Sequence, residues 1–254
     1  AERWFGPVRT ARNQRSPSRG CRGWRAGYPG RATPVLRCIG HGGASALAPA
    51  NTLRSFELAV ELGADMVEFD VRRHGGRLLL AHTVLDALRP CCLELDDALA
   101  WLSTEGGDGL GLVLDLKSSG IEHAVVDALR RHRLQERAIV TSQRRLPLRR
   151  IAETAPAVRT AVSIAGRLSR AVQRWGEWRD EVVADLRAGR HRAVMAHRRL
   201  VDGDLVDRVR DAGAELYAWT ARRPADVAAL ARLQPDGIVT TDPRLLAAPQ
   251  RAGR

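Results

Sequence analysis

Two histidines and two carboxylates lie within one short stretch of the sequence, and their chemistry suits proton transfer beside a bound cation. His41 and His82 flank Glu68 and Asp70, which are separated by a single residue. Imidazole titrates near neutral pH, so each histidine is a candidate general acid or base on one side of a scissile P–O bond. Carboxylate oxygens are the ligands that hard divalent cations take. The pattern therefore indicates acid–base chemistry next to a metal ion.

A third carboxylate is expected to join this pair. Glu68 and Asp70 share one face of a predicted strand because side chains alternate along a strand, and such a pair is unfavourable unless a cation lies between them. Asp115, at the end of the neighbouring predicted strand, completes an all-oxygen set that suits Mg²⁺ or Ca²⁺. The alternative is that these acids pair with arginine, which the sequence has in excess.

Three further residues are candidates for contacting a substrate. Lys117 is the only lysine of the sequence, and a compact ammonium group beside the metal suits a phosphate oxygen. Codon bias toward arginine is the alternative explanation of its isolation. Trp219 and His197 come near the ends of two later predicted strands, where they are expected to face the same pocket.

The strand pattern explains why these residues should converge. From Val35 onward, short apolar runs alternate with amphipathic segments of helix length, which is typical of βαβ units. The expected strands cover residues 35–40, 65–71, 110–116, 137–142, 158–164, 192–197, 214–220 and 236–241. They predict a TIM-type (β/α)8 barrel, an α/β fold in which functional side chains gather at the carboxyl ends of the strands.

The apolar run 77–82 does not fit this count. Only five residues separate it from the second strand, whereas a parallel crossover needs a dozen or more. It is therefore predicted to be the return arm of a β-hairpin that turns at Gly75 and Gly76 and brings His82 back toward Glu68 and Asp70.

Two helices have local signals in the sequence. Asn51 or Thr52 can cap the first helix, which Gly63 would end. A longer helix is expected after Ala165, with its tryptophans at positions 175 and 178 used for packing.

The net charge of +12 is concentrated near the start of the sequence. Residues 1–33, rich in arginine and glycine, lack hydrophobic periodicity and are predicted to be a disordered tail. The tail could tether the protein to RNA or an anionic membrane, but a leader without a role is preferred. No specific nucleic-acid partner is expected. Residues 34–248 would form the barrel domain and 249–254 a C-terminal tail.

The sequence contains neither the apolar core of a secretory signal nor an apolar run long enough to span a membrane. Its four cysteines show no metal-ligand spacing. We therefore expect a cytoplasmic protein.

Taken together, these motifs resemble the glycerophosphodiester phosphodiesterase family of phospholipase C-like barrels. The family pattern H-R-G-A-S-x-x-x-P-E-N-T, E-x-D, H-D and E-x-K corresponds here to HGGASALAPANT, EFD, HT and DLK. The segments AWTARRPADVAAL and PDGIVTTDP are also similar, and the resemblance extends over residues 35–246.

The resemblance implies metal-dependent hydrolysis of a small-molecule glycerophosphodiester to glycerol phosphate and an alcohol. His41 and His82 then look like the acid–base pair, and Lys117 resembles the residue that contacts phosphate. Trp219 would line the glycerol side of the pocket. The metal ligands would be the three carboxylates at positions 68, 70 and 115.

The sequence departs from the family pattern at four positions. Gly42 stands where the family has an arginine expected to hold phosphate, a charge-assisted contact worth about 1.5–3 kcal/mol. Ala50 replaces a glutamate near the same site, so the two losses are coupled if that glutamate oriented the arginine. Asp115 is shorter than the usual glutamate, which a flexible Ca²⁺ shell tolerates best. Thr83 replaces an aspartate and leaves His82 without its nearest carboxylate.

Arg72 or Arg73 could supply the missing cation, although strand alternation allows only one of them to point inward.

We interpret the sequence as a divergent family member. Two alternatives are a pseudoenzyme that binds a phosphodiester without turnover and a lysophospholipase D-like enzyme. The absence of an apolar insertion near the site favours water-soluble substrates. The leaving-group alcohol, the choice between the two metals and the oligomeric state are left open.

Overall fold

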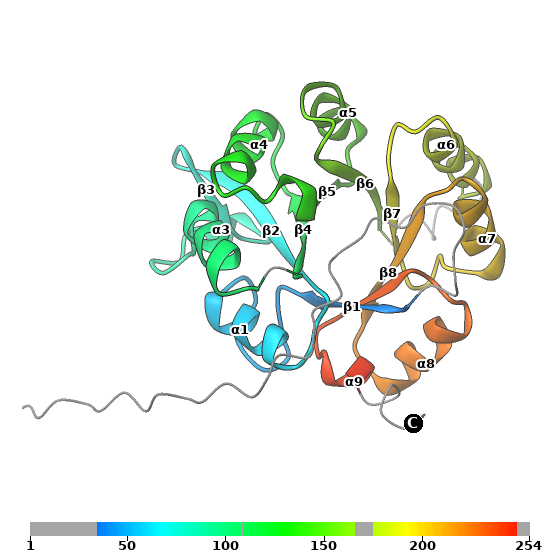
Figure 1. Ribbon diagram of the computed structural model, residues 1–254, viewed down its shortest axis with the longest axis horizontal. Coiled ribbons are helices and arrows are strands. Elements are labelled where there is room, and N and C mark those ends of the chain that lie inside the picture. Colours follow the sequence, from blue (N-terminus) through cyan, green and yellow to red (C-terminus); the bar gives the residue numbers. More distant parts are fainter. Residues whose placement is uncertain (1–34, 108, 166–174, 248–254) are drawn as a thin grey trace, which may run out of the picture.

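The computed structural model describes residues 35–107, 109–165 and 175–247. In this part of the chain eight parallel strands close into a barrel, and helices surround the ring of strands (Figure 1). Around the ring the order is β1-β9-β8-β7-β6-β5-β4-β2, and β1 pairs with β2 to close it. The predicted TIM-type barrel is confirmed. The predicted tails 1–33 and 249–254 lie outside the described residues.

The strands agree closely with the apolar runs of the sequence. Those of the ring are β1 (Arg37–His41), β2 (Met66–His74), β4 (Gly111–Leu116), β5 (Ala138–Ser142), β6 (Arg159–Ile164), β7 (Ala193–His197), β8 (Glu215–Ala221) and β9 (Gly237–Thr240). The second strand continues three residues beyond its predicted end because it runs on into the hairpin arm.

The helices lie between the strands. They are α1 (Leu53–Glu61), α2 (Val84–Ala87), α3 (Leu95–Thr104), α4 (Glu122–Arg131), η1 (Gln135–Arg137), α5 (Arg145–Thr154), α6 (Trp175–Arg187), α7 (Gly203–Asp211), α8 (Pro224–Arg232) and α9 (Arg244–Ala247). Thr52 is the cap of α1, since its side chain accepts a hydrogen bond from the Ser55 backbone N–H. The tryptophan rings of α6 stack on each other, as the packing role predicted, whereas its expected start after Ala165 lies outside the described residues.

Strand alternation separates the core from the site. On β2 the outward residues Val67, Phe69 and Val71 are fully buried in the large core between sheet and helices. There the ring of Phe69 packs against that of Phe56 on α1, with 5.5 Å between ring centroids. Met66, on the opposite face, belongs to the smaller cluster inside the barrel. Residues of even number on β2 therefore point toward the barrel axis.

β3 (Arg77–Leu80) is the hairpin arm. It pairs antiparallel with the end of β2, from Val71 opposite Leu80 to His74 opposite Arg77. Gly75 and Gly76 make the turn with φ values of 54° and 80°, a left-handed conformation that favours glycine. The predicted arm is confirmed, and it continues β2 beyond the carboxyl end of the barrel.

A buried ionic cluster lies at the amino end of β8. Glu215 is 3% exposed, lies 3.1 Å from the Arg37 guanidinium, pairs with Arg159 and accepts a hydrogen bond of 2.7 Å from the Tyr217 hydroxyl. Burial disfavours the charged carboxylate, but Arg159 and Arg37 outweigh it and lower the pKa of Glu215. The cluster therefore links β1, β6 and β8 at the end of the barrel opposite the site.

We predict that Glu215→Gln destabilises the protein by about 3 kcal/mol, because it leaves buried guanidinium charge without its counter-ion. Equilibrium denaturation in urea measures the difference. Glu57→Gln is the matched control, since Glu57 and Arg54 form an exposed pair whose loss should cost less than about 1 kcal/mol. Equal costs in the two variants would contradict this role.

Candidate active site

A cavity opens among the carboxyl ends of the strands and collects most of the predicted site residues. Its lining contains His41, Glu68, Asp70, His82, Asp115, Lys117, Thr141, Gln143, Ser163, Met195, Trp219 and Val239. Seven of the eight predicted residues are among them, and His197 is the exception.

Three carboxylates meet on adjacent strands. Asp70 of β2 lies opposite Asp115 of β4 in the sheet register. One oxygen of each and one of Glu68 all lie within 4.8 Å of one another. The side chains are buried, and this burial, together with the charges of Asp70 and Asp115, raises the pKa of Glu68 well above its usual value. Excess negative charge of this kind favours a bound cation, and the donor set fits a hard divalent ion.

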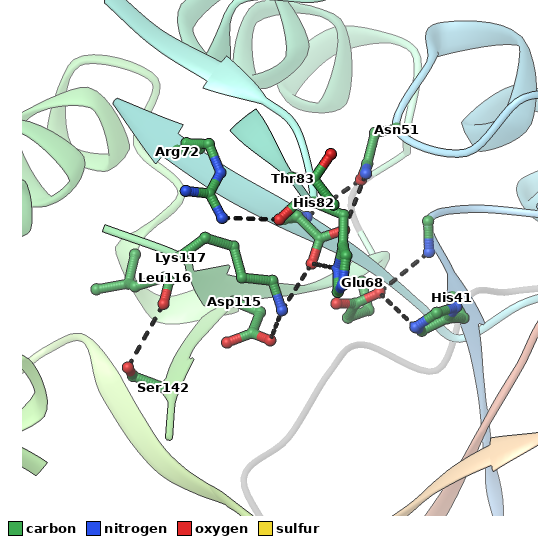
Figure 2. A network of polar contacts seen from close by, with 12 residues as sticks. His41, Asn51, Glu68, Arg72, His82, Thr83, Asp115, Leu116, Lys117 and Ser142 are labelled. Atoms are coloured by element: carbon green, nitrogen blue, oxygen red, sulfur yellow. Dashed lines mark hydrogen bonds and ion pairs between the residues drawn. The ribbon is translucent and has the colours of Figure 1, made fainter. Parts of the chain in front are cut away.

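Lys117 compensates part of this charge. Its Nζ lies 3.0 Å from Asp70 Oδ1. The same Nζ lies 2.5 Å from Asp115 Oδ2 (Figure 2). Burial opposes the ammonium charge, but Asp115 and Asp70 outweigh it and raise the pKa of Lys117. The alternative that the acids pair with arginine is wrong for the described residues, because lysine takes that place. Glu68 has no contact with this lysine, so it is the least compensated of the three acids.

The two histidines have different environments. His41 Nε2 lies 4.0 Å from Glu68 Oε2, and burial lowers the pKa of His41 to about 4 although Asp70 opposes the shift. His82 Nδ1 lies 3.2 Å from Asp70 Oδ1, and this hydrogen bond raises the pKa of His82. Thr83 deprives His82 of a carboxylate on the neighbouring residue, and Asp70 is the carboxylate that His82 contacts instead. Thr83 caps α2 instead.

Asn51 is a site residue that sequence reasoning treated only as a possible helix cap. Its Nδ2 donates to Asp70 Oδ2 at 2.9 Å, and its Oδ1 accepts from the Asp70 backbone N–H at 3.1 Å. The residue has φ 62°, a conformation that asparagine tolerates better than most side chains. The sequence signal was an asparagine directly before the true cap, Thr52.

Two hydroxyl groups were also missed by sequence reasoning. Thr141 of β5 lies opposite Asp115 in the sheet, and Ser163 lies on β6. Both side chains are buried and line the cavity. Among the described residues, the Thr141 hydroxyl has no hydrogen-bond partner. Their positions at predicted strand ends were the available signal.

Trp219 lines the cavity, and its Nε1 donates to the Met195 carbonyl at 3.0 Å. His197 packs against the tryptophan edge to face, with ring centroids 5.3 Å apart. His197 therefore contacts the wall residue rather than the cavity itself, and the expectation that it faces the pocket is not met.

Gly42 and Ala50, two of the departures from the family pattern, are in contact. Gly42 has φ +59°, and a Cβ atom at this position would lie 2.8 Å from the Ala50 Cβ. The Gly42 backbone N–H donates to Glu68 Oε2 at 3.0 Å. Gly42, which has no side chain, and Ala50, which has only a methyl group, thus leave room for the backbone N–H of Gly42 to contact the carboxylate.

The hairpin arm decides between the two arginines. Arg72 follows Glu68 and Asp70 on the inward face of β2, and its Nη2 donates to the His82 carbonyl at 2.8 Å (Figure 2). Its buried Nε has no partner among the described residues. Arg73 turns to the other side, where its Nη2 donates to the Gly120 carbonyl at 2.6 Å. Arg72 is therefore the inward arginine.

The glycerophosphoryl diester phosphodiesterase family model matches residues 41–74 and 115–245, which include all of these carboxylates as well as Lys117 and Trp219. The chain belongs to this family. It is 25% identical over 243 residues to a glycerophosphodiester phosphodiesterase of Caldanaerobacter subterraneus subsp. tengcongensis, a match that covers 82% of this chain and 95% of the relative.

Solved structures of phosphodiesterases share the fold. A phosphodiesterase from Oleispira antarctica, in complex with the product sn-glycerol-3-phosphate, has a TM-score of 0.66 at 22% identity and covers 82% of this chain and 94% of its own. A glycerophosphodiester phosphodiesterase from Parabacteroides distasonis has a TM-score of 0.68 at 17% identity. The match covers 87% of this chain and 100% of that structure's chain. The family identifies the chain as a phosphoric diester hydrolase. Among its described residues, no helix has the length and apolar character to cross a membrane.

We predict that Asn51→Ala weakens the binding of Mg²⁺ or Ca²⁺ by about 10- to 100-fold, because Asn51 fixes the orientation of Asp70. Isothermal titration of the metal into the purified protein measures the change. Asn51→Gly, which relieves the left-handed backbone, should show the same loss, whereas Thr52→Ala should lower stability and leave affinity intact. Unchanged affinity in both Asn51 variants would refute the role.

Proposed function

We propose that this family member hydrolyses glycerophosphodiesters to glycerol phosphate and an alcohol, with a divalent metal and His41 and His82 as the acid–base pair. The observation that carries the proposal is the cluster of three buried carboxylates with Lys117, bordered by both histidines. The Caldanaerobacter relative, named a glycerophosphodiester phosphodiesterase, supports the substrate class.

Glu68, Asp70 and Asp115 are the residues that would hold the metal. When bound, Mg²⁺ or Ca²⁺ would polarise the phosphate and offset the negative charge that develops during hydrolysis. Lys117 remains positively charged between Asp70 and Asp115, so it is placed to contact a phosphate oxygen at the edge of the carboxylates. The bound metal and the Lys117 ammonium would together offer positive charge to the oxygens of a phosphate group.

The histidines would move the protons. His82 holds its Nδ1 toward Asp70, which leaves Nε2 to donate a proton to the departing alcohol oxygen as the P–O bond breaks. His41, across the carboxylates at the end of β1, would accept the proton of the attacking water at a ring nitrogen. The water oxygen forms the new bond to phosphorus, so one water is consumed for each diester cleaved. Trp219 offers an apolar wall for the glycerol carbons.

We expect His41→Ala and His82→Ala each to lower kcat by about 100- to 10,000-fold, because each removes one proton transfer. The assay is release of glycerol 3-phosphate from glycerophosphocholine with Mg²⁺ or Ca²⁺, and EDTA should abolish turnover. His123→Ala is the control, since His123 lies exposed on α4.

Full activity in either active-site variant would rule out the two-histidine mechanism. Binding of glycerol 3-phosphate by a wild-type protein that releases no product from any glycerophosphodiester would favour the pseudoenzyme alternative.

We further propose that Arg72 is a positioning residue, which compensates in part for the arginine that Gly42 replaces by holding His82 in place. Its hydrogen bond to the His82 carbonyl holds the return strand of the hairpin, and so positions the imidazole over Asp70. Its Nε is buried without a hydrogen-bond partner among the described residues, and Arg72 is not among the residues that line the cavity, so its effect on the site runs through His82.

Arg72→Ala should therefore lower kcat/KM by about 10- to 100-fold, the value of a hydrogen bond to a charged group. Arg73→Ala is a matched control, because it removes the same charge from the next residue of the strand but on the opposite face. Steady-state kinetics with glycerophosphocholine compares the two. Similar losses in both variants would indicate a general effect of charge and contradict the proposal.

A further inference from the structure

Three inward side chains form a row across β2, β4 and β5. In the sheet register Asp70 lies opposite Asp115, and Asp115 lies opposite Thr141. Neighbouring strands are about 4.8 Å apart, so each side chain of the row starts close to the next. Ile139, two residues before Thr141 on β5, belongs to the apolar cluster inside the barrel, so Thr141 points inward as well. Thr141 therefore lies beside the two aspartates on the same face of the sheet.

The Thr141 hydroxyl is buried and makes no hydrogen bond within the described part of the chain. The residue is 2% exposed and lines the cavity of the active site. Burying a hydroxyl without a hydrogen bond costs free energy, so buried polar groups in proteins almost always have a partner. Thr160, on the neighbouring strand β6, is equally buried, but its hydroxyl lies 3.0 Å from His191 Nδ1. The Thr141 hydroxyl is thus available to a ligand of the cavity.

Two carboxylate oxygens of the same cluster make no hydrogen bond with the described residues. Lys117 contacts Asp115 through Oδ2, and the Gly42 backbone N–H contacts Glu68 through Oε2. No hydrogen bond from the described residues reaches Asp115 Oδ1 or Glu68 Oε1. These two oxygens and the Thr141 hydroxyl therefore have lone pairs that the described chain does not use.

The charges of the cluster favour a neutral group as the next oxygen donor. The three carboxylates, Lys117 and a divalent cation cancel in formal charge. A fourth carboxylate would restore an excess of negative charge, whereas a hydroxyl adds a lone pair without adding charge. Ser163 also lines the cavity with a hydroxyl, but it lies on β6 opposite Met195, one strand farther from Asp115. Of the two hydroxyls, that of Thr141 is the one on the strand next to the carboxylates.

A fourth protein oxygen suits one of the two candidate cations better than the other. Ca²⁺ takes about 6–8 oxygen ligands at about 2.3–2.6 Å in a flexible shell that includes neutral protein oxygens. Mg²⁺ requires a nearly ideal octahedron at about 2.0–2.1 Å, loses its water reluctantly and is usually bound by one or two carboxylates. A site that offers a hydroxyl besides three carboxylates replaces more water than Mg²⁺ readily gives up.

We propose that the Thr141 hydroxyl is a fourth protein ligand of the cation and that it makes the site selective for Ca²⁺ over Mg²⁺. Glu68, Asp70 and Asp115 supply the negative charge, and Thr141 supplies a neutral oxygen from the adjacent strand. The inference rests on the metal site of the proposed function and specifies the ion that this site takes. It also accounts for a buried hydroxyl that has no partner in the described part of the chain.

Isothermal titration of Ca²⁺ and of Mg²⁺ into the metal-free full chain, without substrate, tests the proposal. The wild type should bind Ca²⁺ more tightly than Mg²⁺. Thr141→Val, which keeps the shape of the side chain, should weaken Ca²⁺ binding at least about tenfold and Mg²⁺ binding less. Thr141→Ser, which keeps the hydroxyl, should bind Ca²⁺ nearly as the wild type does. Thr160→Val is the matched control, since it removes an equally buried hydroxyl outside the cavity, and it should leave both affinities unchanged.

The outcomes of the titration separate the proposal from the function on which it rests. Equal Ca²⁺ affinity of Thr141→Val and the wild type would overturn the role of Thr141 while leaving the carboxylate site intact. A wild type that binds Mg²⁺ more tightly, or equal losses for both ions in Thr141→Val, would overturn the selectivity. A wild type that binds neither ion would contradict the metal site of the proposed function itself, and the role of Thr141 with it.

Stability without metal distinguishes a ligand from a structural hydroxyl. In EDTA, Thr141→Val should unfold in urea at the same midpoint as the wild type or a higher one, because it removes a buried hydroxyl that makes no hydrogen bond with the described residues. Thr160→Val should unfold at a lower midpoint, since it leaves His191 Nδ1 without its contact. Addition of Ca²⁺ should raise the midpoint of the wild type more than that of Thr141→Val. If Thr141→Val were destabilised in EDTA as much as Thr160→Val, the hydroxyl would have a structural role and the proposal would be overturned.

Discussion

The architecture of the site depends on one electrostatic constraint, the mutual repulsion of three carboxylates that the barrel buries within 4.8 Å of one another. Asp70 is the most heavily compensated, because Lys117, His82 and Asn51 all contact it. Glu68 receives only a backbone N–H and a distant imidazole. Within the chain, Lys117 and His82 offset part of the cost of burying these carboxylates, and Glu68 remains the least compensated of the three.

The barrel has one buried cluster of charged side chains at each of its two ends. At the amino end, Glu215 meets two arginines, and its charge is balanced within the protein. At the carboxyl end three acids meet a single lysine, so the residues of the site do not by themselves balance the negative charge. The apolar layer between them, which includes Met66 and Tyr217, keeps the two clusters apart inside the barrel. Stability and reactivity can therefore reside in the same ring of strands without competing for the same side chains.

The barrel, the hairpin arm and seven cavity residues could be predicted from the sequence, because strand alternation and strand-end position are local properties. What the sequence could not predict depends on chain segments that meet only in three dimensions. The hairpin was predicted to bring His82 near Glu68 and Asp70, but its exact return path selects Asp70 as the partner. The bidentate contact of Asn51 requires the left-handed turn before α1.

The contact between Gly42 and Ala50 also bears on how this site can change over evolutionary time. Any side chain at position 42 would collide with the Ala50 Cβ, and the left-handed backbone there adds strain for all residues except glycine. A substitution of Gly42 by arginine would therefore require the loop between β1 and α1 to shift as well. A single substitution at this position is thus structurally constrained, whereas the exposed residues of the hairpin arm are free of this particular collision.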